Sequence, residues 1–336
     1  MIKTAIQKLV TGENLSRKEV IGAMDMVMGG GATPAQISAF LTALRMKGET
    51  IEEITGCAQV MKNKATHIQP NVNAYIDLVG TGGDGVNTFN ISTTAAFVAA
   101  AAGVPIAKHG NRAISSRSGS IDVLEALGIN VMLPPEKVQL CVEKCGIGFM
   151  FARTFHPAMK NVSVVRGELG IRSVFNILGP ISNPSDAKRQ VIGVFDKTLT
   201  HPIANVMLNM GVERGMVLCC EGIDELTTTA PNTVSEIKDG KIFDYIITAS
   251  DLGFHDASAG DIKGGTAEEN AAITLSILGG EKGAKRDTVL MNAGAAIYIA
   301  GFADSLENGI KAAAEAIDSG KALGKLKEVV KFTNEI

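Results

Sequence analysis

The stretch YIDLVGTGGDGVNTFNISTT, residues 75–94, decides the fold of this chain. Residues 75–79 favour a β-strand, residues 80–94 are rich in glycine and hydroxyl side chains, and an alanine-rich helical pattern follows from Ser92. A second short apolar run, residues 104–109, favours another strand. Strand, glycine loop, helix and strand predict a βαβ unit, whose two strands are parallel.

The pattern on the carboxyl side of this unit predicts a larger sheet. Short apolar runs that favour strands recur at residues 148–151, 190–195 and 216–220, with a helix at residues 121–127. Residues 234–237 and 242–247 flank Asp239 and Gly240, which predicts a hairpin appended to the sheet, and from Thr266 onward the pattern is helical. We therefore expect an α/β fold with a central, mostly parallel sheet flanked by helices.

The first 65 residues carry helical signals instead. Three segments start with a Ser or Thr that is followed three residues later by a Glu or Gln, a capping box that satisfies the free amides of a helix start. These pairs are Ser16 with Glu19, Thr33 with Gln36, and Thr50 with Glu53. We expect residues 1–70 to form a small N-terminal all-helical domain and residues 71–336 to form a large α/β domain.

Composition and charge limit the classes of function. The 336 residues are 46% hydrophobic and 20% charged, which suits a folded protein with a sizeable core. A net charge of −3 provides no basic field to attract nucleic acid or acidic membranes, so we expect small-molecule partners. The start of the chain lacks the pattern of a secretory signal, and no apolar run reaches the roughly 20 residues that span a bilayer, so we expect a cytoplasmic protein.

The five cysteines do not form a recognisable site. They form no CxxC pair, and none stands at metal-ligand spacing from a histidine. We interpret them as reduced thiols that pack in the core.

The glycine loop at residues 80–94 is the first candidate site. Glycines allow a tight turn whose N–H groups point at an anion, and the following helix start adds partial positive charge. The loop lacks the Lys-Ser/Thr of a P-loop and the usual dinucleotide fingerprint, so it predicts a phosphate-bearing ligand without naming one. A structural turn that uses glycine only to reverse the chain is the alternative.

The second candidate is KHGNRAISSRSGS, residues 108–120, which follows the second predicted strand. Parallel strands bring their carboxyl ends to one edge of the sheet, so this loop and the glycine loop should face one crevice. Lys108, Arg112 and Arg117 supply positive charge, and four serines supply donors for phosphate oxygens. The alternative is a solvated polar loop.

The third candidate is EGIDELT, residues 221–227, which follows another predicted strand. Asp224 and Glu225 are adjacent carboxylates, which in most proteins face solvent or cap a helix. If they meet the two loops, they would repel a bound phosphate unless a cation stood between them, and oxygen ligands with a polyphosphate select Mg²⁺.

Six motifs together resemble the anthranilate phosphoribosyltransferase family, which belongs to the nucleoside phosphorylase-like phosphoribosyltransferases. They are GTGGD at 80–84, NIST at 90–93, KHGNR at 108–112 followed by SSRSGS, HPAMKNV at 156–162, NILGP at 176–180 and GIDE at 222–225. The resemblance covers essentially the whole chain. It implies that helices near residues 157–178 join the N-terminal ones, and that this small domain forms a homodimer.

The resemblance also implies site residues. The residues implied to bind the phosphoribosyl donor are Gly80, Gly83, Asp84, Thr88, Asn90, Ile91, Ser92, Thr93, Lys108, His109, Gly110, Asn111, Arg112, Ala113, Ile114, Ser115, Ser116 and Ser120. Those implied to bind anthranilate are Gly80, His109, Asn111 and Arg166, with the Arg166 guanidinium on the carboxylate. Those implied to bind magnesium, as two ions with the donor, are Ser92, Asp224 and Glu225.

Without the resemblance, two of these residues have another interpretation. Arg166 alone is an exposed charge on a helix, and His109 alone is a histidine beneath its own loop. Ile114 and Ile121 depart from the family pattern, which affects the packing of the loop more than its donors.

The implied activity is a Mg²⁺-dependent transfer of the phosphoribosyl group of 5-phosphoribosyl 1-diphosphate to the amine of anthranilate, in tryptophan biosynthesis. The acceptor amine is unprotonated at neutral pH, so positioning and electrostatics suffice and no catalytic side chain is assigned. An association with anthranilate synthase is compatible with this role.

Two rival functions stay open at the level of sequence. A pyrimidine nucleoside phosphorylase has a similar fold and also works at an anomeric carbon, and it would cleave thymidine or uridine with phosphate. A non-catalytic nucleic-acid-binding paralogue would need a basic face, which the net charge and the carboxylate pair disfavour.

Overall fold

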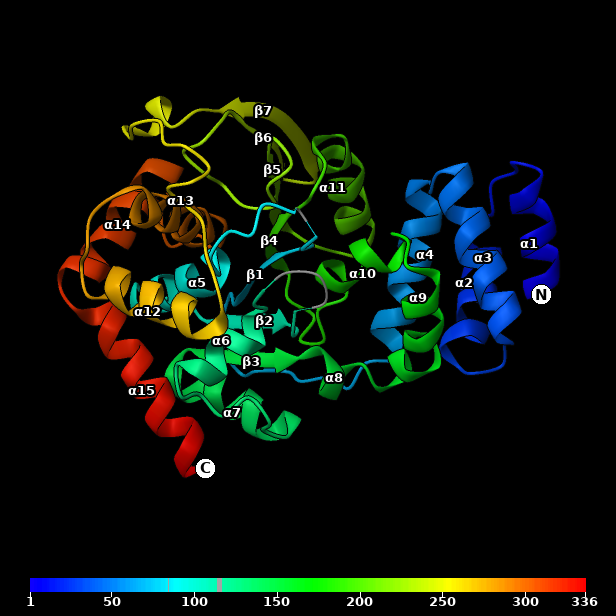
Figure 1. The fold of residues 1–336 in the computed structure, drawn as a ribbon, viewed down its shortest axis with the longest axis horizontal. Helices are drawn as coiled ribbons and strands as arrows, with labels where there is room; N and C mark the ends of the chain where they lie inside the picture. Colours follow the sequence, from blue (N-terminus) through cyan, green and yellow to red (C-terminus); the bar gives the residue numbers. More distant parts are fainter. Residues whose placement is uncertain (84, 114–116) are drawn as a thin grey trace.

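A computed structural model describes residues 1–83, 85–113 and 117–336 of the chain. It consists of a small N-terminal helical domain and a large α/β domain built on one sheet, as the sequence predicted. Figure 1 shows the N-terminal helices gathered at one end of the molecule and the C-terminus at the other. The strands of the described residues are β1 Ile76–Gly80, β2 Ile106–Gly110, β3 Ile147–Phe151, β4 Arg189–Gly193, β5 Arg214–Cys220, β6 Asn232–Lys238 and β7 Lys241–Ile247.

The helices enclose this sheet and form the separate bundle. The α-helices of the described residues are α1 Ile2–Val10, α2 Arg17–Met28, α3 Pro34–Lys47, α4 Ile51–Asn63, α5 Ile91–Ala101, α6 Ser120–Ala126, α7 Pro135–Cys145, α8 Ala152–Phe155, α9 Ser163–Leu169, α10 Phe175–Ile181, α11 Thr200–Asn209, α12 Ala267–Leu278, α13 Ala284–Ile299, α14 Leu306–Asp318 and α15 Lys321–Glu335. Short 3₁₀ helices lie at η1 Pro157–Asn161, η2 Lys197–Leu199 and η3 Ser250–Leu252.

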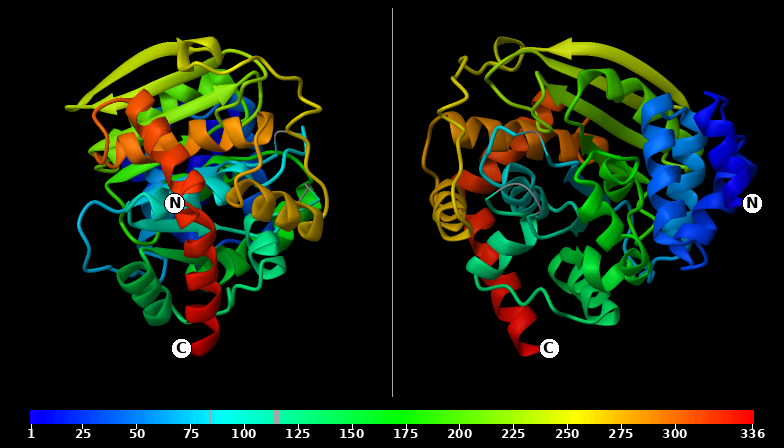
Figure 2. Two further views of the ribbon diagram at one scale, coloured as in Figure 1. Left: turned by 90° about the vertical axis from the view of Figure 1, so that its left-hand side faces the viewer. Right: turned by 45° about the vertical axis from the view of Figure 1, so that its right-hand side comes forward.

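The sheet has the strand order β3-β2-β1-β4-β5-β6-β7. The pairs from β3 to β5 are parallel, and β6 and β7 add the predicted antiparallel hairpin at one edge, which Figure 2 shows along the top of both views. The chain moves outward from β1 to β3 and then returns to β4 on the other side of β1. The strand order therefore reverses between β1 and β4, where open α/β sheets place their ligands.

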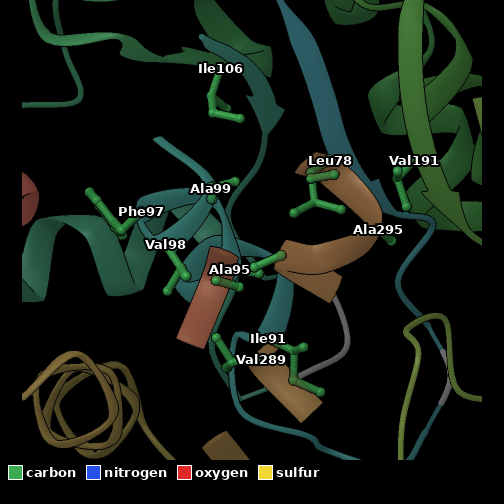
Figure 3. Packing of buried hydrophobic residues seen from close by; sticks show 14 of the residues in the cluster. Leu78, Ile91, Ala95, Phe97, Val98, Ala99, Ile106, Val191, Val289 and Ala295 are labelled. Carbon is green, nitrogen blue, oxygen red and sulfur yellow. The ribbon is translucent and has the colours of Figure 1, made fainter. Parts of the chain in front are cut away.

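One face of the sheet packs against α5 and α13. Leu78 of β1 and Val191 of β4 meet Ala95 of α5 and Ala295 of α13, and Figure 3 shows these side chains converging. Alanines let the helices approach closely, which explains why the α5 sequence is alanine-rich. Burial of α5 on nearly all sides fixes the direction of its N-terminus toward the glycine loop.

The opposite face shares a core with the N-terminal helices. Ile192 and Val217, which alternate with the residues of the first face, lie in one apolar cluster with Phe40 of α3 and Phe175 of α10. Residues between η1 and α10 therefore pack with α1 to α4, and Figure 1 shows α9 beside that bundle. The boundary at residue 70 itself stays a prediction.

Local sequence signals account for the bundle. All three predicted capping boxes are present, with the side chains of Ser16, Thr33 and Thr50 each accepting from the amide three residues later. Thr266 starts α12 in the same way. The five cysteines lie in described parts of the chain and are buried free thiols. In the part of the chain that the structure describes, no helix has the length and apolar character to cross a membrane.

The second predicted strand begins and ends later than expected. The apolar run suggested residues 104–109, whereas β2 is Ile106–Gly110. Lys108 and His109 were predicted both as the end of this strand and as the start of the loop segment 108–120; they belong to the strand, and only 2% and 5% of their surfaces are exposed. Pairing with Phe149 and Met150 of β3 extends the strand through them.

Candidate phosphate and metal site at the sheet edge

The three predicted site segments meet at the reversal point of the sheet. The glycine loop leaves β1, and the segment with Asp224 and Glu225 leaves β5, two strands away. The Thr81 amide donates to the Gly193 carbonyl oxygen over 3.0 Å, which ties the loop after β1 to the end of β4. The Gly82 amide donates to Asp224 Oδ2 over 2.6 Å, which ties it to the segment after β5.

Two glycines at strand ends make room for Asp224. A Cβ on Gly80 would overlap the Asp224 carboxylate, and a Cβ on Gly193 would overlap the Asp224 carbonyl oxygen. Glycine is therefore required at these positions for the close approach of another backbone. Gly80 was predicted as a site residue, whereas Gly193 was missed, because a single glycine at a strand end gives no hint of what approaches it.

Asp224 and Glu225 accept hydrogen bonds from backbone amides that could otherwise donate to an anion. Helix α5 starts after Asn90 without a side-chain cap, so its first amides are available to other groups. Glu225 Oε1 accepts from the Ser92 amide over 3.0 Å, and Asp224 Oδ2 accepts from Gly82. In the free chain, the two carboxylates thus stand where the glycine loop and the helix start offer donors for phosphate oxygens.

The acidic pair is buried and lies near one lysine. Asp224 and Glu225 are 7% and 8% exposed. Burial, followed by the charge of Asp224, raises the pKa of Glu225 to about 8, and the Lys108 ammonium opposes this shift. Lys108 Nζ donates to the Leu78 carbonyl oxygen and to Ser92 Oγ, the latter over 3.3 Å. Its pKa is lowered by burial, against the charges of Asp77, Glu225 and Asp224.

These residues fit a divalent cation. Two adjacent buried carboxylates and the Ser92 hydroxyl are hard oxygen ligands, and burial together with the charge of Asp224 raises the pKa of Glu225, an effect that a bound cation would oppose. Within residues 1–83, 85–113 and 117–336, no group of three or more His, Cys, Asp or Glu side chains could hold a metal by itself. A cation here would therefore need oxygen ligands from a bound polyphosphate as well.

A further buried carboxylate, on Asp77, supports the end of β2. Asp77 is fully buried; its Oδ1 accepts from the His109 amide over 3.2 Å and its Oδ2 from Asn183 Nδ2 over 2.6 Å. Asn183 also donates to the Ala107 carbonyl oxygen. Burial raises the pKa of Asp77 to about 6, and Lys108 limits that rise. Asp77 and Asn183 were not predicted, because an acid within an apolar strand is visible in the sequence but its partner 106 residues away is not.

The described residues at the two ends of the second loop form hydrogen bonds and ion pairs with helix α6. Ser120 Oγ contacts both the amide and the carbonyl oxygen of Asn111 over 3.2 Å, and Gly110 approaches Ser120 closely. Arg112 forms ion pairs with Asp122 and Glu125, and the Ala113 amide donates to Asp122. The structure therefore pairs Arg112 with carboxylates of α6, so a phosphate contact would require that pair to open.

The remaining predicted donor residues that the structure describes lie in the glycine loop and in the first turn of α5. Thr88 forms an isolated bridge with Lys263, and Asn90 Oδ1 accepts from Asn270 Nδ2 over 2.9 Å. Ile91 and Thr93 are buried, at 1% exposure each. Gly83 has a φ of +73°, which favours glycine. Asp84, Ile114, Ser115 and Ser116 lie outside the described residues.

Two of the predicted acceptor residues, His109 and Arg166, contact α10, whereas Gly80 lies against Asp224 and Asn111 contacts Ser120. His109 Nδ1 lies 3.2 Å from the Gly179 carbonyl oxygen, and its ring meets that of His156 at a centroid distance of 4.9 Å. Burial lowers the pKa of His109 to about 3, so the ring is neutral at neutral pH. The Arg166 guanidinium lies 5.0 Å from the centroid of the Phe175 ring, and burial lowers its pKa.

Comparison with protein families covers both domains. Residues 72–323 match the "Glycosyl transferase family, a/b domain" and residues 3–65 match the "Glycosyl transferase family, helical bundle domain". A protein of Acetivibrio thermocellus named anthranilate phosphoribosyltransferase is 58% identical over 335 residues, which cover 99% of this chain and 97% of the relative. One of the same name from Alkaliphilus metalliredigens is 52% identical over 100% of this chain and 99% of its own length.

Solved structures with similar folds carry the same name. The anthranilate phosphoribosyltransferase of Thermus thermophilus matches with a TM-score of 0.94 at 44% identity, covering 98% of this chain and 99% of that one. The enzyme of Saccharomyces cerevisiae, in complex with PRPP and Mg, matches with a TM-score of 0.91 at 28% identity, covering 100% and 98%.

Proposed function

Because this chain belongs to the anthranilate phosphoribosyltransferase family, we propose that it transfers the phosphoribosyl group of 5-phosphoribosyl 1-diphosphate (PRPP) to the amine of anthranilate. The products are N-(5-phosphoribosyl)anthranilate and diphosphate, and the reaction belongs to tryptophan biosynthesis. The observation that carries this function in the chain's own residues is the meeting of the glycine loop, the start of α5 and the Asp224–Glu225 pair at the sheet reversal.

Magnesium dependence is part of the proposal. A solved relative binds PRPP and Mg, and the carboxylate pair here supplies suitable ligands. We assign Ser92, Asp224 and Glu225 to the metal, with two ions as the number that the family resemblance implies. When bound, Mg²⁺ neutralises charge on the diphosphate as it leaves.

The carboxylates must exchange partners when the donor binds. Asp224 and Glu225 hold the Gly82 and Ser92 amides in the free chain, and phosphate oxygens would compete for the same donors. If the two carboxylates held the metal, the Gly82 and Ser92 amides would be able to donate to phosphate oxygens of the donor. Metal and donor should therefore bind synergistically, since each relieves the repulsion that the other would meet.

The acceptor side needs no general base. We assign anthranilate to the region of Asn111, His109 and Arg166, with the Arg166 guanidinium recognising its carboxylate. His109 is neutral, and the aromatic amine already has a free lone pair, so the chain only positions the amine and stabilises charge at the anomeric carbon.

The test follows the fluorescence of anthranilate. The purified protein is mixed with anthranilate, PRPP and Mg²⁺, and fluorescence should fall only when all three are present. Phosphate-dependent cleavage of thymidine or uridine, with no loss of anthranilate, would instead identify a nucleoside phosphorylase. A protein that consumes neither substrate set would refute the proposal.

A homodimer through the helical domain is the assembly that we propose. Met46 of α3 and Val164 of α9 are 83% and 67% exposed, on helices that share one apolar cluster, which suits a surface covered by a second copy. A cytoplasmic location and an association with anthranilate synthase stay predictions.

A further inference from the structure

Arg172, in the link between α9 and α10, is a residue that none of the predicted site motifs includes. Its Nη2 donates to the carbonyl oxygen of Gly83, in the glycine loop. Its guanidinium lies 4.1 Å from the centroid of the Phe195 ring, in the loop after β4. One side chain thus contacts both loops of the sheet reversal and comes from the segment that carries the acceptor residues.

The link that carries Arg172 is locally ordered. Gly170 ends α9 in the left-handed conformation, and the Ser173 amide donates to Asn176 Oδ1 over 3.0 Å at the start of α10. The backbone on both sides of Arg172 is therefore held by its own hydrogen bonds. Figure 1 shows α9 beside the helical bundle and α10 between the bundle and the strands, so this link runs from the bundle toward the sheet.

The Gly83 contact completes the support of a loop with few side chains. The Thr81 and Gly82 amides are held by Gly193 and Asp224, but Gly83 has no side chain of its own and a positive φ. A charge-assisted hydrogen bond is the stronger kind of support for an isolated carbonyl group. The Phe195 ring holds the planar guanidinium in place, a contact that an ammonium group makes less well.

We propose that Arg172 is a positioning residue for the phosphoribosyl donor, which acts through Gly83 to hold the glycine loop in its binding conformation. This inference rests on the proposed function and deepens it. Arg172 holds the glycine loop and does not itself contact the phosphate. Its replacement should therefore weaken binding of the donor far more than binding of anthranilate.

The experiment compares Arg172→Ala, Arg172→Lys and Phe195→Leu with the wild-type chain. Arg153→Ala serves as the matched control, because Arg153 is an exposed arginine of nearby α8 outside the proposed site. Binding of PRPP with Mg²⁺ is measured by calorimetry without anthranilate, the KM of each substrate is measured by steady-state kinetics, and the melting temperature reports folding.

We expect Arg172→Ala to weaken PRPP binding about tenfold, the fold-change that corresponds to one charge-assisted hydrogen bond, with the KM of anthranilate changed less than about twofold. Arg172→Lys should recover part of the affinity. Phe195→Leu should also weaken PRPP binding, because it removes the aromatic ring against which the Arg172 guanidinium packs and keeps the positive charge of Arg172.

Three outcomes would overturn the inference. Wild-type PRPP affinity in Arg172→Ala would show that the contact has no effect. A loss in Arg172→Ala with no change in Phe195→Leu would indicate direct contact with phosphate. Equal losses for both substrates with a lowered melting temperature would indicate a general structural role. If wild-type protein binds PRPP but does not consume anthranilate, the proposed function fails while the positioning test still stands.

Discussion

At the scale of single residues, buried charge dominates this protein. Asp77, Lys108 and Glu225 are nearly inaccessible to water, and each has a pKa displaced by burial first and by its charged neighbours second. Buried charges are retained at a cost, which is offset here only where hydrogen bonds and opposite charges surround them. Lys108 and Glu225 both contact Ser92 at the start of α5, where phosphate and metal are proposed to bind, whereas Asp77 supports the end of β2.

Replacement of the acidic pair tests the metal role. Asp224→Asn combined with Glu225→Gln keeps the shape and removes the negative charge, so we expect turnover to fall by at least about a hundredfold and Mg²⁺-dependent PRPP binding to be lost in calorimetry. The melting temperature should hold, since the side-chain amide oxygens can still accept from the Gly82 and Ser92 amides. Full activity at saturating Mg²⁺ would reject the assignment of these ligands.

Arg166→Ala should weaken anthranilate binding by about 1.5 to 3 kcal/mol, the range for charge-assisted hydrogen bonds. The affinity for PRPP should stay nearly constant, because Arg166 lies on the α9 side and contacts Phe175. Steady-state kinetics with each substrate varied in turn checks this split. A larger effect on PRPP than on anthranilate would contradict it.

Asp77 predicts a pH dependence of stability. Its pKa is raised from 3.8 to about 6 in the folded chain, so its favourable contribution is complete below about pH 3.8 and is lost as pH rises through 6. Asp77→Asn lacks this titration. The variant should therefore gain on the wild-type protein between about pH 4.5 and pH 8 by on the order of 2 kcal/mol, whatever its constant cost.

Unfolding in urea at the two pH values measures the Asp77 effect. The charged group that acts on Asp77 is Lys108, whose ammonium limits the shift; Asn183 donates to Asp77 through its side chain and His109 through its backbone amide, and neither of these donors titrates in this range. A stability difference between variant and wild type that does not change with pH would contradict the raised pKa.

At the scale of elements, the site is a set of helix and strand ends. Helix α5 starts without its own side-chain cap, and Glu225 accepts from its Ser92 amide instead. Helices α2, α3 and α4 have complete capping boxes by contrast. A helix start left open at the carboxyl edge of a parallel sheet is available to a ligand, whereas a capped one serves only the fold.

Gly193→Ala tests the close approach at the end of β4. The added Cβ would overlap the Asp224 carbonyl oxygen, which is backbone and has little freedom to move. We expect a destabilisation of about 3 kcal/mol in urea unfolding, at the upper end for overpacking, and a loss of Mg²⁺-dependent activity.

Gly324→Ala is the matched control for Gly193→Ala. Gly324 lies in α15, where an added methyl group would meet nothing within 4 Å, so alanine there should be neutral or stabilising by up to about 1 kcal/mol through helix propensity. Equal effects of the two substitutions would show that the crowding at Gly193 has no consequence.

At the scale of the whole molecule, two apolar clusters meet across the sheet. One joins α5 and α13 to the first face, and the other joins the N-terminal helices, α9 and α10 to the opposite face. The acceptor residue Arg166 therefore belongs to a segment packed with the helical domain, whereas the donor loop belongs to the sheet. The reaction that we propose takes place where the segment packed with the helical domain meets the glycine loop, and Arg172 of that segment contacts the loop.

Val164→Glu tests the proposed dimer. A charge on this exposed apolar position of α9 should shift the sedimentation profile from dimer toward monomer at micromolar concentration, because a buried unpaired carboxylate disfavours the interface. Leu275→Glu, on α12, is the control at an exposed apolar position away from the helical domain. A wild-type profile that is already monomeric would refute the dimer.

The sequence by itself predicted most of the strands, the helix starts of the N-terminal bundle and a candidate site at one edge of the sheet. Alternation of short apolar runs with helical patterns predicted the strands and the appended hairpin, and the capping boxes predicted the helix starts, because these signals depend on neighbours a few residues apart. The glycine loop and the Asp224–Glu225 pair could be assigned to one sheet edge because parallel strands leave their carboxyl ends on the same side.

Only the tertiary structure decided which groups face one another. Gly193 beneath Asp224, Asn183 on Asp77, the pairing of Arg112 with α6 and the reach of Arg172 to Gly83 join positions that lie ten to more than a hundred residues apart. The burial of Lys108, which the sequence predicted both as the end of a strand and as the start of a loop, likewise follows from strand pairing with β3. Such contacts depend on how the packed layers bring distant segments together, and no local pattern of residue types encodes that arrangement.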